Sequence, residues 1–149
     1  MLRVFYILPS IWSNRPVGAK LRLAMLAAAL LCAVPLAVAG RLQPHPDGLG
    51  THQQLGLPPC TIRVMWGVRC PSCGMTTSWS YFVRGRLWMS LRSNVAGTLL
   101  AVIASLAVIV LFSGFASGKM PGRGSLVFAA WGMVLAWIVA IADWAWRLV

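Results

Sequence analysis

The chain has 149 residues, of which 59% are hydrophobic and 10% are charged, whereas a soluble domain carries about 25% charged residues. It holds 13 Lys and Arg residues against 2 Asp and Glu residues, for a net charge of +11. This composition excludes a disordered chain. It also argues against a soluble single-core domain. It argues against a nucleic-acid binder as well, because the basic residues lie between apolar segments and not on an otherwise charged, soluble surface. We therefore expect an all-α integral membrane protein surrounded by the lipid bilayer, with no nucleic acid among its partners.

Three apolar segments have the length of membrane spans. A helix needs about 20 apolar residues to cross a hydrocarbon core of roughly 30 Å. The first segment covers residues 23–40, the second ends the region 60–115 as residues 95–115, and the third covers residues 126–149. Backbone groups in lipid must bond to one another, so each segment is predicted to be a transmembrane helix.

Residues 1–22 form a basic segment ahead of the first span, and basic residues are enriched on the cytoplasmic side of membranes. We therefore expect a multi-pass protein of the inner, cytoplasmic membrane with a cytoplasmic N-terminus. The small residues 37–39 resemble a signal cleavage site. The apolar stretch and the segment before it are both longer than in a signal peptide, which favours a retained anchor.

Residues 41–59 form a Pro- and Gly-rich loop, and residues 116–125 link the last two spans. After the cysteines in the sequence, apolar residues recur at helical spacing, as Met75, Trp79 and Phe82. This pattern predicts a short cysteine-bearing helix. Residues 61–83 as a fourth or re-entrant span would place more arginines on the cytoplasmic side. Their Arg, Thr and Ser residues make a poor lipid-facing helix, so we expect three firm spans and a short helix tucked against them.

Three of the four cysteines lie close together in the sequence, as Cys60, Cys70 and Cys73. The fourth, Cys32, lies inside the first apolar segment and is interpreted as a small apolar residue. Because the C-x-x-C pair flanks the start of the predicted helix, backbone N–H groups and the helix dipole favour a thiolate there. Arg69 adds positive charge, so we expect at least one acidic, reactive sulfur.

The run from Cys70 to Thr76 reads C-P-S-C-G-M-T, with Cys60 ahead of it. Gly85 and Asn94 follow, ahead of an apolar span. Together these residues resemble the bacterial domain-of-unknown-function family 2752 over residues 60–115. The resemblance implies a small membrane protein with a cysteine-bearing helix and no established activity. It implies these supporting motif residues: Pro71, Gly74, Thr76, Gly85 and Asn94. Two positions depart from the family pattern, Thr77 in place of a basic residue and Val95 in place of Pro.

Metal binding is the leading interpretation of the cysteines. Cys60, Cys70 and Cys73 supply three thiolates, and a C-x-x-C turn lets two sulfurs reach one ion, with zinc as a candidate. Structural zinc sites usually have four ligands, so His52, His45 or a partner chain would supply the fourth.

Two other interpretations stay open. Cys70 and Cys73 suit thiol–disulfide exchange, because C-P-x-C at the start of a helix is the arrangement of redox-active dithiols. Cys60 can instead pin the loop through a structural disulfide, in an accessory subunit of another membrane protein. The carboxylates are only Asp47 and Asp143, too few for a paired acid–base site. The sequence thus predicts a non-enzymatic membrane protein organised around the three cysteines.

Overall fold

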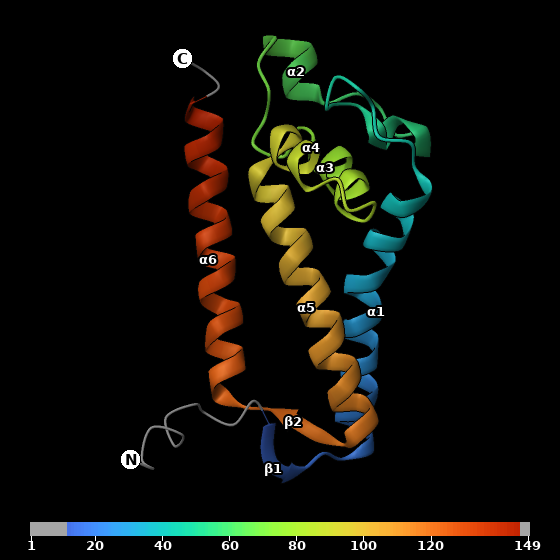
Figure 1. The fold of residues 1–149 in the computed structure, drawn as a ribbon, viewed down its shortest axis with the longest axis vertical. Helices are drawn as coiled ribbons and strands as arrows, with labels where there is room; N and C mark the ends of the chain where they lie inside the picture. Colours follow the sequence, from blue (N-terminus) through green and yellow to red (C-terminus); the bar gives the residue numbers. More distant parts are fainter. Residues whose placement is uncertain (1–11, 147–149) are drawn as a thin grey trace. The chain divides into compact units, whose positions relative to one another are not determined.

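The computed structural model describes residues 12–146 and confirms a mainly helical membrane protein (Figure 1). Three helices are long and apolar enough to cross a membrane: α1 Ala19–Arg41, α5 Val95–Ser117 and α6 Arg123–Trp146. Each contains most of one predicted span, and α1 and α6 begin a few residues before the apolar runs. Part of the predicted basic segment, residues 1–11, and the chain end, residues 147–149, lie outside the described residues.

Between α1 and α5 the chain forms four short helices instead of a fourth span. These are the 3₁₀ helix η2 Thr51–Leu55 and the α-helices α2 Thr61–Trp66, α3 Met75–Phe82 and α4 Leu87–Ser93. The longest, α3, has 8 residues and therefore a length of about 12 Å, less than half of a bilayer core of about 30 Å. Residues 61–83 thus hold two short helices joined by the cysteine loop, and the fourth full span is not formed.

The described part of the chain divides into two compact units, and the first comprises residues 12–33 and Ile103–Met133. Here β1 Trp12–Pro16 pairs antiparallel with β2 Lys119–Pro121, a small ribbon that the sequence did not predict. Arg22 donates from Nε and Nη2 to the carbonyl oxygen of Phe115 at 3.0 and 2.8 Å. Carbonyl groups at a helix C-terminus have no partner within the helix, so Arg22 satisfies one at the end of α5.

The second unit comprises Val34–Val102 and residues 134–146 and holds a buried cluster of hydroxyl groups. Ser78 Oγ lies 3.0 Å from both Ser90 Oγ and Thr98 Oγ1, and the latter two lie 2.7 Å apart. A hydroxyl group both donates and accepts, so these groups satisfy one another without water. The polarity that made residues 61–83 a poor lipid-facing helix is used for packing α3 against α4 and α5.

Close approach of α5 to α3 depends on Gly97. A Cβ atom at Gly97 would lie 3.2 Å from Ser78 Oγ and 3.3 Å from Met75 Cα. At the other end of α3, the Arg84 guanidinium donates to the carbonyl oxygens of Gly40 at 3.1 Å and Leu42 at 2.7 Å. Arg84 therefore joins the end of α3 to the C-terminal carbonyl groups of α1, so both ends of α3 are fixed within this unit.

Candidate metal centre

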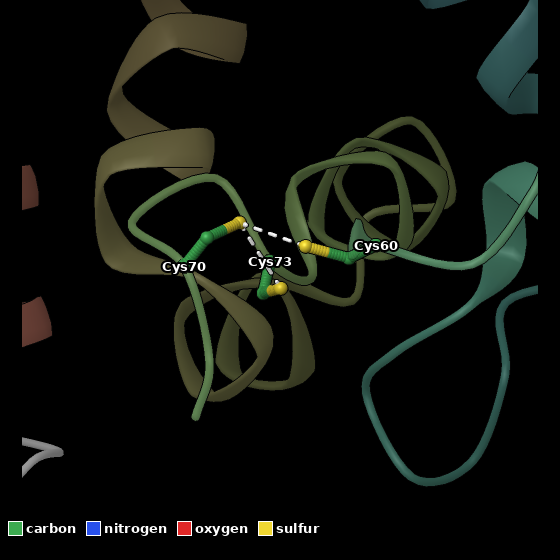
Figure 2. A group of neighbouring side chains, drawn as sticks. All are labelled: Cys60, Cys70 and Cys73. Atoms are coloured by element: carbon green, nitrogen blue, oxygen red, sulfur yellow. Dashed lines mark hydrogen bonds between the residues drawn. The ribbon is translucent and has the colours of Figure 1, made fainter. Parts of the chain in front are cut away.

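The sulfur atoms of Cys60, Cys70 and Cys73 converge in the structure (Figure 2). Cys70 lies between the other two, with its Sγ 3.5 Å from that of Cys60 and 3.1 Å from that of Cys73. All three sulfurs lie within 4.8 Å of one another. The side chains are half-buried and the thiols are free. Across residues 12–146, this is the one group of three or more His, Cys, Asp or Glu side chains with ligand spacing.

Two separate segments supply these sulfurs. Cys60 is the residue before α2, while Cys70 and Cys73 belong to a tight turn in which the N–H of Cys73 donates to the carbonyl oxygen of Cys70 at 3.0 Å. The turn passes into α3 through Gly74, whose φ of +86° is in the left-handed region that favours glycine. The C-x-x-C turn therefore places two sulfurs at the start of α3, as the sequence predicted.

Gly74 is also required by its neighbours. A Cβ atom at this position would lie 2.7 Å from the carbonyl oxygens of both Gly48 and Ser93. These are backbone atoms, so they cannot move aside as a flexible side chain would. The glycine of the C-P-x-C-G run thus lets the cysteine turn pack directly against two other backbone segments.

Asn94 fixes the same turn from α5. Its Nδ2 donates to the carbonyl oxygens of Pro71 at 3.0 Å and of Cys73 at 3.1 Å. Its Oδ1 accepts the N–H of Gly97 at 2.7 Å, which makes Asn94 the N-cap of α5. One fully used amide side chain therefore joins the cysteine turn to the start of a membrane span.

The other motif positions have structural explanations. Gly85, with φ +73°, closes the turn behind α3, and Thr76 lines the cleft beside the cysteines. Thr77, where a basic residue was expected, is fully buried and bonds to Thr51 Oγ1 at 2.8 Å. Val95 is the first residue of α5, a position that suits Pro but does not require it. Both departures from the family pattern are thus accommodated by this fold.

Sequence reasoning missed one contact of the cysteine loop. The indole N–H of Trp144 in α6 donates to the carbonyl oxygen of Arg69, the residue before Cys70, at 2.7 Å. The two residues are 75 positions apart in the sequence. No local pattern could have paired them.

Cys60 and Cys73 have different affinities for their protons. The pKa of Cys60 is lowered, chiefly because the backbone N–H of Arg63 in α2 lies near its sulfur and favours the thiolate. Burial, together with the neighbouring Cys70 thiol, raises the pKa of Cys73 to about 12. Of these two thiols, the more acidic is Cys60 and not Cys73 at the start of α3, where the helix dipole had favoured a thiolate. A bound cation would favour ionisation of all three.

The two histidines lie outside the sulfur cluster. His52 donates from Nε2 to the carbonyl oxygen of Pro58 at 3.2 Å, although it borders the same cleft as the cysteines. His45 Nδ1 accepts the N–H of Asp47 at 3.3 Å and lies 3.6 Å from its carboxylate. The predicted role of His52 as a fourth ligand stays a prediction.

The comparisons with known proteins are consistent with this description. Neither the curated proteins nor the solved structures contain a match to the chain. A family match covers residues 60–109, from the first clustered cysteine through Asn94 into α5. It confirms the resemblance inferred from the C-P-x-C-G-x-T run: residues 60–109 match the family of proteins of unknown function DUF2752.

Proposed function

We propose that this is a small, non-enzymatic membrane protein that binds one metal ion, with zinc as the leading candidate, through Cys60, Cys70 and Cys73. The observation that carries the proposal is the convergence of three free sulfurs from two separate segments to within 4.8 Å. Tetrahedral zinc with Zn–S bonds of about 2.3 Å holds its sulfurs roughly 3.8 Å apart. The spacings of 3.1 and 3.5 Å therefore need only a small expansion.

The packing of α2 gives the ion a structural purpose. This helix has six residues, none of them buried, and Val64, Met65 and Trp66 are each about two-thirds exposed. Isolated helices of this length are unstable in water, so α2 needs an attachment. A metal ion bound by Cys60 would join the start of α2 to the turn that Asn94 holds on α5.

Metal analysis of purified protein tests the proposal. We expect the detergent-purified chain to carry about one ion, and Cys60→Ser, Cys70→Ser and Cys73→Ser each to lose it, because removing a thiolate leaves two in a site that normally has four ligands. Cys32→Ser is the matched control, since Cys32 lies in α1 and outside the cluster. A folded wild type that binds neither zinc nor another thiophilic ion would refute the proposal.

A second function is favoured by the 3.1 Å between the sulfurs of Cys70 and Cys73. Joining them forms one S–S bond and releases two protons and two electrons to an acceptor disulfide or quinone. Cys60, 3.5 Å from Cys70, could then take over the bond by exchange. In that case Cys73→Ser would accumulate mixed disulfides. A Cys60 disulfide that never cycles would indicate a purely structural role in an accessory subunit.

We also propose that the N-terminus faces the cytoplasm in the inner membrane of a bacterial cell. The support is the basic segment ahead of α1. With three spans, the cysteine region between α1 and α5 then faces the outside. An impermeant maleimide should label chelator-treated cysteines in intact cells, and labelling only after lysis would reverse the orientation.

A further inference from the structure

We propose that the ion bound by Cys60, Cys70 and Cys73 keeps a fourth coordination position open to the adjoining cleft, where it takes a small carboxylate-bearing thiol as the thiolate. This inference rests on the proposed metal site. It goes beyond that site by assigning a ligand to the cleft.

The cleft has the size and lining of a small-molecule site. Its volume is about 620 Å³, and all three cysteines form part of its wall. Ligand sites for small molecules occupy roughly 300–1,000 Å³ and are mostly apolar with a few polar groups. The remaining wall is of this kind and includes Leu49, Pro59, Val64 and Met75. An ion among the three sulfurs would therefore border a space that admits a ligand.

The described protein residues leave the fourth position to such a ligand. Among residues 12–146, the cluster with ligand spacing consists of the three cysteines alone. His52, the nearest alternative in the cleft wall, directs Nε2 to the carbonyl oxygen of Pro58. Zinc sites with three protein ligands characteristically accept an external fourth ligand. The same arrangement here makes the site exchangeable rather than closed.

The chemistry of the wall selects the ligand class. Thiophilic ions in sulfur-rich sites prefer a further soft donor, so a thiolate suits the open position. Arg63 also lines the cleft, and its exposed guanidinium can pair with a carboxylate on the ligand. The backbone N–H of Arg63 lies near the Cys60 sulfur, and a substitution of the Arg63 side chain leaves it in place. A small thiol acid therefore matches both the ion and its surroundings.

Cobalt absorption tests the inference on the full chain in detergent. With Co²⁺ bound, we expect 3-mercaptopropionate to raise the sulfur-to-cobalt absorption by about a third, since a fourth thiolate joins three. It should bind about two- to fivefold more tightly than the uncharged 2-mercaptoethanol, the range of a solvent-exposed ion pair. Arg63→Gln should abolish this preference. Arg69→Gln is the matched control, since Arg69 is also exposed beside a cysteine but does not line the cleft.

The outcomes separate this inference from the metal site itself. Absence of any sulfur-to-cobalt absorption in a folded wild type that also binds no zinc would overturn the proposed function. Strong absorption that neither thiol changes would overturn only the open position. A cobalt spectrum that His52→Ala alters before any thiol is added would make His52 the fourth ligand, and would equally overturn it. If Arg63→Gln and Arg69→Gln lost the preference for 3-mercaptopropionate equally, Arg63 would not be the group that pairs with the ligand carboxylate.

Discussion

The side-chain amide of Asn94 donates a hydrogen bond to the carbonyl oxygen of Cys73 at 3.1 Å while its Oδ1 caps α5. The cysteine turn and the start of a membrane span therefore share one side chain. Mutation of groups that hold the ligands of a metal in position typically lowers the metal affinity by about 10- to 100-fold. This relationship makes Asn94 a positioning residue for the proposed centre.

Asn94→Asp should separate the two tasks of this side chain. A carboxylate still caps α5, but it cannot donate to the carbonyl oxygens of Pro71 and Cys73 and repels them. We expect metal affinity, measured by competition with a chelator, to fall about tenfold or more, with helix content retained. Gln54→Glu is the control, because it makes the same chemical change in an exposed amide that bonds to Gln43. Equal affinities for both variants would exclude the positioning role.

Gly74→Ala should be far more disruptive than Gly67→Ala. Both glycines have positive φ, +86° and +69°, so each substitution carries a conformational cost of about 1 kcal/mol. Only at Gly74 does the new Cβ also meet two backbone oxygens at 2.7 Å, whereas at Gly67 nothing lies within 4 Å. Overpacking should add about 1–3 kcal/mol to the loss in unfolding free energy. Denaturation in detergent measures the difference, and equal losses would show that the turn packs otherwise.

The metal-free protein should show an order of thiol reactivity. The thiolate is the nucleophile, so the lowered pKa of Cys60 predicts faster alkylation than at Cys73, whose pKa is raised to about 12. Near neutral pH we expect Cys60 to react first, and Cys73 to become comparable only as the pH approaches about 12. Mass spectrometry of reduced, metal-free Cys32→Ser protein measures both rates, and faster reaction at Cys73 would contradict the assignment.

Arg84→Gln should loosen the connection between α3 and α1. The guanidinium donates to the carbonyl oxygens of Gly40, Leu42 and Ser80. Hydrogen bonds from a charged group matter most where the acceptors lack other partners, so we expect a loss of about 1–2 kcal/mol in unfolding free energy. Arg86→Gln, two residues along and exposed, should cost less than about 0.5 kcal/mol. The prediction fails if the two variants unfold alike.

The parts of the fold that the sequence predicted are those set by local patterns. Apolar runs of spanning length identified α1, α5 and α6, because lipid leaves a backbone few alternatives to a helix. The C-x-x-C spacing also predicted that Cys70 and Cys73 lie together at the start of α3, because the geometry of a four-residue turn is set locally.

The missed features depend on contacts between distant segments. The β1–β2 ribbon, the Thr51–Thr77 hydrogen bond and the contact from Trp144 to Arg69 each join residues with no shared periodicity. The raised pKa of Cys73 was missed for a related reason. The helix-dipole argument weighed only the local N-terminus of α3, whereas burial and the neighbouring sulfurs govern Cys73.

Thiol accessibility tests the central claim most directly. Native membranes containing the Cys32→Ser chain are solubilised, and the remaining thiols are counted with a maleimide before and after a chelator or a reductant. A metal held by Cys60, Cys70 and Cys73 predicts that labelling appears after the chelator alone, because thiolates bound to the ion cannot react. Labelling that appears only after the reductant, or that is complete before either treatment, would contradict a metal centre.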